Sequence, residues 1–491
     1  MKYGWMPLMF LMLTVPSDAA SPILRPGQSP LVTLRLVFRT GAAHDPPGKH
    51  GLAAMTAAMI AKGGTRNMSY QQIVEALFPM AVNVESNVDK EMTTFGAETH
   101  IDNLDAFYAL FRAMLLEPGW REEDLRRLKD DTVNFLQVSL RGNNDEELGK
   151  EALYSEIYTG HPYGHHSMGR VSGIRSITLD DLKKFHAGQY TQANLTIALA
   201  GGYPEAFAKR IESDFAALPK GRSAEAKLPA PKALRGREML MIEKQTRSVA
   251  MSLGFPIDVR RGHPDYAALL LAQSWLGQHR TSGVRLFDRI REARGLNYGD
   301  YAYIEYFPRG MFKFEPDPNL SRRQQIFQVW IRPVEPATAH FTLRLAMHEI
   351  ERFHREGLSR EDFERTRQFL GKYVNLLTKT KRAELGYAID SDFYGIADYN
   401  SYLRSELARL TRERVNQAIR KHLAMDNMKI VVVGQDCEKL RAAIVSEAPC
   451  PMRYNSPKPE DILEEDKIVE KHPLRIKSGN TRIVKVETVF E

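Results

Sequence analysis

One pattern occurs twice in this chain, and its spacing sets the number of domains. Residues 178–201 and 411–434 each begin with a threonine and end with a glycine 23 positions later, with Asn194 and Asn427 at the same place in the two copies. In each copy the threonine is a good helix N-cap, and an apolar run typical of a buried strand precedes the glycine. The copies lie 233 positions apart, nearly half the chain. The repeat therefore predicts two similar α+β domains.

The chain is long enough for this arrangement, and turn-forming residues mark the division. Its 491 residues and 43% hydrophobic share can form two packed cores. We expect domains at 31–217 and 237–450, with a linker at 218–236. The turn-forming residues of the linker are Pro219, Lys220, Gly221, Pro229 and Pro231. In the tail, 451–491, the alternating run from Arg482 to Phe490 predicts a terminal strand or two.

The first twenty residues have the layout of a cleavable signal peptide. Lys2 precedes an apolar run over residues 5–15, and Ala19 and Ala20 offer small residues at a cleavage site. A membrane anchor is the alternative, but this run is shorter than the roughly 20 residues that a spanning helix needs. We therefore expect export to the periplasm and a mature chain without a membrane span.

Charge and cysteine content narrow the classes of function. The net charge of +7 is spread along the chain without a long basic run, which does not favour nucleic acid as a partner. Cys437 and Cys450 are the only cysteines. In an oxidising compartment they could form a disulfide, or both could remain free thiols. The chain has no G-x-S-x-G, Walker or dinucleotide-binding motif.

Residues 51–65, GLAAMTAAMIAKGGT, predict a helix with one face made only of alanine. Ala54, Ala57 and Ala58 lie together at i, i+3 and i+4 spacing. Taken alone, this face indicates a helix that packs closely on a neighbour. The surrounding frame, G-L-A followed by M and K-G-G-T, resembles the zinc helix of the pitrilysin or insulinase-type peptidases, the M16 family.

The resemblance implies a degenerate zinc site. In that family the helix carries H-x-x-E-H, in which two histidines bind zinc and the glutamate activates the metal-bound water. These positions fall on Ala54, Ala57 and Ala58, and the position of the third ligand, a glutamate, falls on Phe135. Hydrocarbon side chains cannot coordinate a cation, so we expect this chain to bind no zinc. The resemblance covers about residues 31–440 and implies two homologous domains, each a sheet with helices on one face, that face each other like a clam shell.

A second segment, VRLFDRIREARGLNY at 284–298, resembles the family's peptide-binding segment. In the family an arginine and a tyrosine at the positions of Arg291 and Tyr298 contact the backbone of a bound peptide. The residues themselves predict that Gly295 ends a helix, with Arg291 in its last turn and Tyr298 at the start of a strand. The alternative is an exposed helix arginine and a core tyrosine.

A group of histidines offers an alternative metal site. His161, His165 and His166 crowd the loop GHPYGHHSMG, a spacing that could suit a transition metal. The family has a G-H-P-Y-G loop with a conformational role here, which favours a structural interpretation. His44 and His50 flank the loop before the alanine helix, where a solvated position is the simpler interpretation.

These features together favour an exported, non-catalytic M16 homologue. It would be the substrate-binding subunit of a heterodimeric metallopeptidase whose partner carries an intact H-x-x-E-H and the zinc. One alternative is a stand-alone peptide-binding or scaffold protein. Another is a hydrolase that uses an unrelated metal site at the His161 loop.

Overall fold

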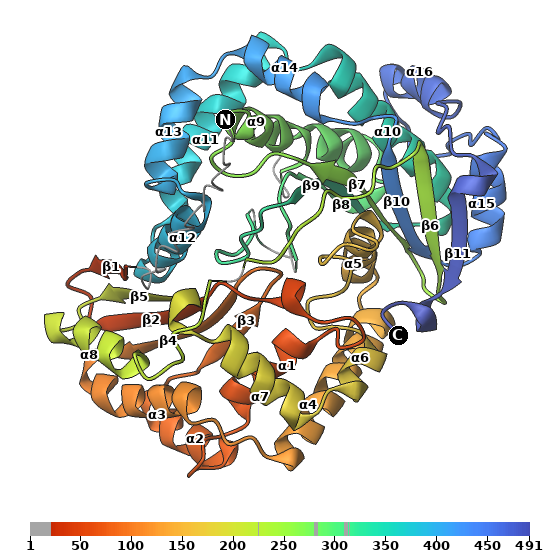
Figure 1. Ribbon diagram of the computed structural model, residues 1–491. Coiled ribbons are helices and arrows are strands. Elements are labelled where there is room, and N and C mark those ends of the chain that lie inside the picture. The colour runs from red at the N-terminus through yellow and green to blue at the C-terminus, as the bar shows by residue number, and fades with distance from the viewer. Residues whose placement is uncertain (1–20, 224, 279–282, 309–312, 314) are drawn as a thin grey trace, which may run out of the picture.

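The computed structural model describes residues 21–491 except 224, 279–282, 309–312 and 314. The expected signal peptide at 1–20 lies outside the described residues. Figure 1 shows two halves that face each other, each with its own sheet, and this confirms the predicted two-domain α+β fold.

The N-terminal half is built on a five-stranded sheet with the order β1-β5-β2-β4-β3. Its strands are β1 (Ile23–Pro26), β2 (Leu31–Phe38), β3 (Glu85–Val88), β4 (Thr93–His100) and β5 (Leu195–Gly201). Only the pair β1 and β5 is parallel. Strand β1 begins before residue 31, where we expected the domain to start, because it pairs with β5 at the edge of the sheet.

Most helices of this half cover one face of the sheet (Figure 1). The helices of this half are α1 (Leu52–Lys62), α2 (Tyr70–Leu77), α3 (Leu104–Leu116), α4 (Glu122–Asn134), α5 (Asp145–Ile157), α6 (Val171–Ser176), α7 (Leu179–Gln189) and α8 (Glu205–Phe215), of which α5 is the exception described below. Helix α4 continues into a π-helical segment, Phe135–Gly142. Along β2, the side chains of Val32, Leu34 and Leu36 enter the core under these helices.

The C-terminal half has a six-stranded sheet with the order β11-β6-β10-β7-β9-β8. Its strands are β6 (Arg237–Glu243), β7 (Val249–Ile257), β8 (Asn297–Tyr303), β9 (Gln325–Val334), β10 (Met428–Gly434) and β11 (Thr481–Lys485). Strand β11 lies in the tail, where a terminal strand was predicted, and pairs parallel to β6.

The helices of this half are α9 (Tyr266–Gly277), α10 (Ala339–Glu356), α11 (Arg360–Leu377), α12 (Lys381–Tyr394), α13 (Tyr399–Arg409), α14 (Arg412–His422), α15 (Cys437–Val445) and α16 (Glu460–Val469), with a π-helical segment at Phe287–Glu292. Single 3₁₀ turns lie at Ala42–His44, Phe78–Met80, Ile101–Asn103, Gln192–Asn194, Pro336–Thr338, Ser478–Asn480 and Val486–Thr488.

The internal repeat is visible in the helix caps. The Thr178 hydroxyl accepts a hydrogen bond from the Asp181 amide at 3.2 Å and opens α7, and the Thr411 hydroxyl accepts one from the Arg414 amide at 3.3 Å and opens α14. The two helices lead into the buried strands β5 and β10, each of which ends at a glycine. The matched spacing therefore corresponds to matched structure.

Helix α5 belongs to the N-terminal half but packs on the sheet of the C-terminal half. Its side chains Leu148, Ala152 and Leu153 share one core with Val431 and Val433 of β10. A Cβ atom added at Gly149 would lie 3.2 Å from the Ser252 hydroxyl, so the glycine allows close approach. Helices therefore cover both faces of the second sheet, whereas we predicted helices on one face only.

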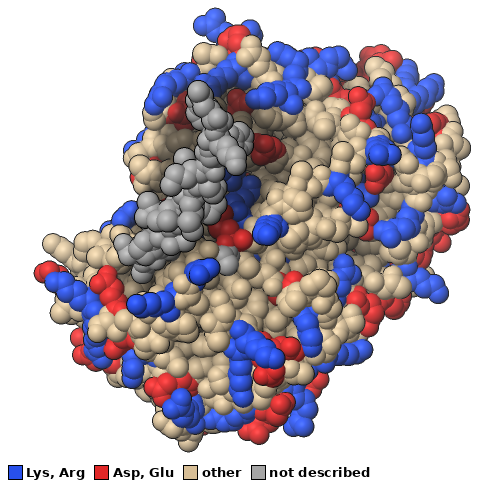
Figure 2. Space-filling model, viewed as in Figure 1, with Lys and Arg blue, Asp and Glu red and all other residues tan. Residues whose placement is uncertain are grey.

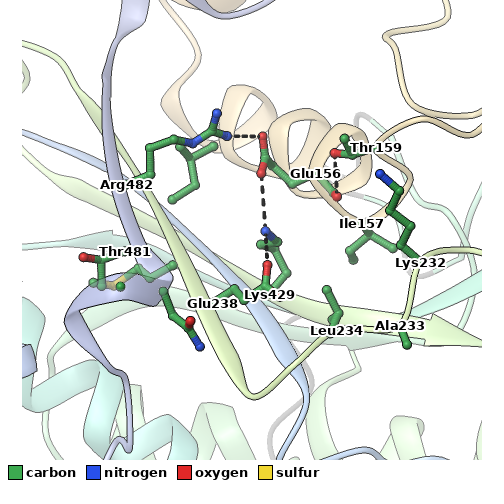
Figure 3. Close-up of a pocket in the computed structure, with 14 residues that line it drawn as sticks. Glu156, Ile157, Thr159, Lys232, Ala233, Leu234, Glu238, Lys429, Thr481 and Arg482 are labelled. Atoms are coloured by element: carbon green, nitrogen blue, oxygen red, sulfur yellow. Dashed lines mark hydrogen bonds and ion pairs between the residues drawn. The ribbon is translucent and has the colours of Figure 1, made fainter.

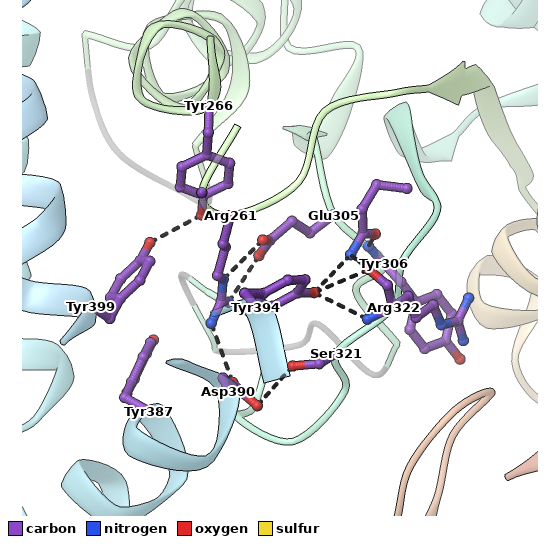
Figure 4. A network of polar contacts seen from close by, with 12 residues as sticks. Arg261, Tyr266, Glu305, Tyr306, Ser321, Arg322, Tyr387, Asp390, Tyr394 and Tyr399 are labelled. Carbon is purple, nitrogen blue, oxygen red and sulfur yellow. Dashed lines mark hydrogen bonds and ion pairs between the residues drawn. The ribbon is translucent and has the colours of Figure 1, made fainter. Parts of the chain in front are cut away.

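Buried ion pairs also join the halves. Arg322 donates to the Asp89 carboxylate at 2.5 and 2.7 Å, and both side chains are 2% exposed. Figure 4 shows the network beside it, in which the Arg261 guanidinium lies between Glu305 and Asp390. The carboxylate of Asp390 accepts from Ser321 at 2.9 Å, so α12 anchors the loop that carries Arg322.

After β11 the chain crosses to the N-terminal half. The carbonyl of Phe490 accepts from the Val171 amide at 3.0 Å, and the Arg141 guanidinium pairs with Glu491 at 2.8 Å. The side chain of Phe490 is only 3% exposed and joins the N-terminal core. We call residues 486–491 the C-terminal strap. Within the part of the chain that the structure describes, no helix is long and apolar enough to cross a membrane.

Candidate functional site

Asp45 fixes the start of α1, the helix with the alanine face. Its carboxylate accepts from the Gly51 amide at 2.6 Å and from the Ala53 amide at 2.8 Å, so it satisfies amides that a helix leaves unpaired at its first turn. Gly51 has a φ of 107°, a left-handed conformation that favours glycine. A Cβ atom there would lie 2.7 Å from the Met168 carbonyl oxygen.

The predicted zinc-ligand positions carry hydrocarbon side chains in the structure. Ala57 is fully buried, whereas Ala54 and Ala58 are half-buried. Phe135 begins the π-helical segment, and its ring centroid lies 6.1 Å from that of His166. The His166 ring also lies 5.6 Å from the ring of Phe490 in the C-terminal strap. Among the described residues, no three His, Cys, Asp or Glu side chains are placed to hold a metal ion.

The three histidines of the 160–169 loop bond to separate groups. Nε2 of His165 lies 3.1 Å from the Asp45 carboxylate, while Nδ1 of His161 accepts from the Tyr163 amide and Nδ1 of His166 accepts from the Met168 amide, each at 3.0 Å. Burial, with a contribution from Lys90, lowers the pKa of His165 far below its usual range. These contacts shape the loop.

The two histidines before α1 also have local contacts. The His50 ring lies against the ring of His165, with centroids 4.4 Å apart. Nδ1 of His44 accepts from the Gly41 amide at 3.3 Å. Each ring therefore takes part in the packing of the loop that leads to α1.

Arg291 and Tyr298 lie where the sequence placed them and contact each other. Gly295 has a φ of 69°, and its amide bonds to the Arg291 carbonyl at 2.7 Å, which ends the helical segment. The Arg291 guanidinium donates to the Tyr298 carbonyl at 3.0 Å and lies 4.6 Å from the centroid of the Tyr298 ring. The Tyr298 side chain is 51% exposed and lies on β8, an edge strand. The tyrosine is thus a surface residue.

The two cysteines are free thiols, so the structure does not contain the disulfide that the sequence left open. Cys437 lies beside the Gly434 carbonyl, 3.5 Å away, while Cys450 lies beside the Arg344 guanidinium, 3.4 Å away. Burial and the nearby Glu243 carboxylate raise the pKa of the Cys437 thiol to about 12. This thiol is therefore not a nucleophile at neutral pH.

A hollow between the halves was not predicted. A cavity of about 650 Å³ lies between β2, β3 and β4 on one side and the first turn of α12 with the 317–320 loop on the other. Arg35 and Gly96 belong to its floor. Figure 2 shows the groove between the halves, with charged side chains of both signs around it. The strand register places Arg35 beside Gly96, but no local signal in the sequence places α12 opposite them.

A second pocket, of about 470 Å³, lies among α5, β6 and β11 (Figure 3). The Glu156 carboxylate pairs with Arg482 at 2.6 Å and with Lys429 at 3.4 Å, and Lys429 also pairs with Glu238 at 2.8 Å. These charges largely neutralise one another, which is the pattern of a structural junction between elements.

The two-domain fold and helix α1, with alanine at the metal-binding positions, define a class of protein: peptidase-like chains with a degenerate metal site. Comparison with known sequences identifies the family. A profile for Insulinase (Peptidase family M16) matches residues 25–170, and one for the Peptidase M16 inactive domain matches residues 176–370. The two matches span most of the chain, which therefore belongs to peptidase family M16.

Its similarity to individual relatives is distant. "Uncharacterized zinc protease YmxG" of Bacillus subtilis is 24% identical over 297 residues, which is 60% of this chain and 70% of the relative. An "Uncharacterized zinc protease" of Rickettsia bellii is 25% identical over 57% of this chain and 66% of the relative.

The solved structures align over more of the chain. A peptidase M16 inactive domain from Pseudomonas fluorescens has a TM-score of 0.73 at 25% identity, covering 85% of this chain and 97% of its own. A protease from Helicobacter pylori has a TM-score of 0.69 at 13% identity, covering 85% of this chain and 98% of its own, and shows the shared fold alone.

Proposed function

We propose that this chain is a non-catalytic M16 homologue that binds peptides for a zinc-bearing M16 partner. The observation that carries the proposal is the hydrocarbon at all three zinc-ligand positions, Ala54, Ala58 and Phe135. Zinc binding releases about 10 to 16 kcal/mol in structural sites, and all of it comes from side chains that can donate electron pairs. Alanine and phenylalanine donate none.

The glutamate that acts as general base in the zinc motif is also missing. In a zinc peptidase a glutamate removes a proton from the metal-bound water, and the metal polarises the scissile carbonyl. The position of that glutamate is Ala57, which is fully buried under its neighbours. A partner with an intact H-x-x-E-H would supply both the metal and the base.

This chain would contribute side chains that bind the peptide backbone. The Arg291 guanidinium has donors beyond its bond to the Tyr298 carbonyl, and the Tyr298 ring holds it in place. A hydrogen bond from a charged donor to a peptide carbonyl contributes about 1.5 to 3 kcal/mol. Because the carbonyl is common to all peptides, the pair would bind many sequences.

We further propose that the chain works in the periplasm. The apolar run at 5–15, followed by Ala19 and Ala20, supports export. Mass spectrometry of the N-terminus recovered from a periplasmic extract tests this, with Ala20 or Ser21 as the expected first residue. Recovery of an intact Met1 from the cytoplasm would contradict export.

The subunit role is tested by reconstitution. The isolated mature chain, incubated with zinc and a quenched-fluorescence peptide pool, is expected to give no cleavage. Mixed with an M16 homologue from the same cells that carries an intact H-x-x-E-H, it should co-elute in gel filtration and raise the rate of cleavage. Turnover by the isolated chain that a chelator abolishes would overturn the proposal.

The proposed contact between Arg291 and the peptide is tested in the same complex. Arg291→Ala should raise KM by about 10-fold or more, because a charged hydrogen bond to the peptide is lost. Arg360→Ala, at the exposed start of α11, is the control and should leave KM unchanged. Equal kinetics for the two variants would remove Arg291 from the binding site.

A further inference from the structure

The inner face of the N-terminal sheet carries a hollow with a floor made by a glycine. On this face Gly96 of β4 lies directly between Arg35 of β2 and Glu85 of β3 in the strand register. A Cβ atom at Gly96 would be 3.4 Å from Cγ of Arg35, so any larger side chain would fill the space. The missing side chain leaves part of the 650 Å³ cavity open between the two charged residues.

The C-terminal half holds the Arg35 guanidinium in place. Nη1 donates to Oδ1 of Asn319 at 2.6 Å, and Nη2 donates to the Arg382 carbonyl at 3.2 Å. A Cβ atom at Gly386 of α12 would lie 2.7 Å from Nη1, so the guanidinium occupies the space beside this glycine. Asn319 is itself fixed, because its backbone amide donates to Asp390 at 2.9 Å. The arginine is therefore preorganised.

Arg35 differs from the other charged residues of the cavity in its pairing. Arg382 pairs with Glu85 at 2.6 Å, and Lys313 pairs with Asp317. Among the described residues, the partners of Arg35 are the two neutral oxygens of Asn319 and Arg382. Burial, and then the neighbouring charge of Arg382, lower the pKa of Arg35, while the more distant Asp390, Glu85 and Glu98 carboxylates oppose this shift. Of the cations that line the cavity, Arg35 is thus the one without an ion-pair partner among the described residues.

From this geometry we propose that the hollow above Gly96 binds a carboxylate of a bound peptide, with the Arg35 guanidinium as its partner. An arginine has five N–H donors in a planar fork. Two bonds are made to Asn319 and Arg382, which leaves donors for the two oxygens of a carboxylate. The first turn of α12 also lines the cavity and brings the positive end of a 14-residue helix to the same space.

The inference rests on the proposed function in one respect, the peptide nature of the ligand, and it adds a preference for acidic peptides. The carboxylate could come from a glutamate or aspartate side chain or from the end of the peptide chain. Both sources present the same two oxygens. A neutral amide at the same place would leave Arg35 without an ion-pair partner.

Binding of fluorescein-labelled decapeptide pools to the purified mature chain tests the site by fluorescence anisotropy. One pool has Glu fixed at its centre and one has Gln, and each is made with a free and with an amidated C-terminus. We expect the preferred carboxylate to tighten binding by about 10- to 100-fold, the range for hydrogen bonds to a charged group. The Glu and Gln pair reports the side chain, and the acid and amide pair reports the chain end.

Three variants test whether Arg35 and the hollow above Gly96 cause this preference for a carboxylate. Arg35→Gln should remove the discrimination between acid and amide while it leaves the binding of the neutral pool unchanged. Gly96→Val should do the same by filling the hollow with Arg35 still present. Arg39→Gln is the matched control, because Arg39 lies four residues after Arg35, just past the end of β2, and is paired with Asp392 at 2.9 Å. This variant should keep the discrimination.

The outcomes separate the site from the broader function. Discrimination that disappears in both Arg35→Gln and Gly96→Val supports the site. Equal binding of acidic and neutral pools by the parent chain overturns the site and leaves peptide binding intact. Discrimination that survives in Arg35→Gln also overturns it. Failure of every pool to bind overturns the site together with the proposed peptide-binding role.

Discussion

Two residues of this protein show how burial decides the effect of a side chain. Arg322 and Arg382 each form an ion pair between the halves. The Arg322 pair is 2% exposed on both sides, whereas the side chains of Arg382 and Glu85 are 49% and 56% exposed. Water screens the second pair and not the first, so the same interaction has different consequences.

Removal of the buried partner should be costly. Arg322→Leu leaves the Asp89 carboxylate buried and unpaired, which we expect to lower the free energy of unfolding by about 3 to 5 kcal/mol. Arg382→Leu should lower it by less than about 1 kcal/mol. Urea unfolding followed by circular dichroism measures both. Similar losses in the two variants would show that the pair at Arg322 is not shielded from water.

Acid should lower the stability of the fold through protonation of His340, near the start of α10. Burial, with a contribution from Arg344, lowers the pKa of His340 to about 4. The unfolded chain binds a proton near pH 6.5 and the folded chain does not, so stability is lost as the pH falls from about 6.5 to about 4. His340→Gln should reduce this loss by about 1 to 3 kcal/mol. The check is the unfolding free energy at pH 7 and pH 4.5, with His354→Gln at the other end of α10 as the control. Equal pH profiles for the two variants would contradict the assignment.

Among the elements, α5 couples the halves most directly. It continues the N-terminal half in sequence, yet it packs on β7 and β10. The close approach depends on Gly149, which faces Ser252 and Val433.

A larger residue at this glycine should separate helix and sheet. Gly149→Leu places a side chain where Ser252 lies 3.2 Å from the Cβ position, and such overpacking costs about 1 to 3 kcal/mol. Gly371→Leu in α11 is the control, since a Cβ atom there meets no atom within 4 Å and the helix gains about 1 kcal/mol of propensity. Thermal unfolding should therefore shift in opposite directions. A shift in the same direction would indicate that α5 packs loosely.

Sequence reasoning succeeded where the signal was local or repeated. The paired threonine caps and glycine ends predicted β5 and β10 with the helices before them, and Gly295 correctly predicted the end of the segment that carries Arg291.

It failed where the structure depends on contacts between distant segments. The packing of α5 on the other half has no local signature, because its apolar face would suit either core. The hollow at Arg35 requires the register that places Gly96 beside it and the position of α12, which is more than 300 residues further along the chain. Neither follows from periodicity.

At the scale of the whole molecule, the chain begins and ends its described path on the same half. Strand β1 opens the N-terminal sheet, and the C-terminal strap returns to that half after β11 has completed the other sheet. Phe490 buries its ring in the N-terminal core, 5.6 Å from the ring of His166. The strap is therefore a further connection between the halves, in addition to the linker, α5 and the ion pairs.

Truncation of the strap side chain should weaken the whole molecule. Phe490→Ala removes a buried aromatic ring, and we expect a loss of about 3 to 5 kcal/mol. Phe78→Ala is the control, because Phe78 is 83% exposed, and its effect should stay within about 0.5 kcal/mol. Hydrogen exchange at Val171, whose amide donates to the Phe490 carbonyl, should also accelerate in the first variant. An unchanged exchange rate would mean that the strap detaches readily in solution.

The shared core around α5 has a practical consequence for work with fragments. A protease cut within 218–236 would leave two polypeptides that remain associated, since separation would strip α5 from β7 and β10 and expose Leu153 and Val433 to water. Each piece expressed alone should aggregate, and co-expression of the two should restore a soluble complementation pair.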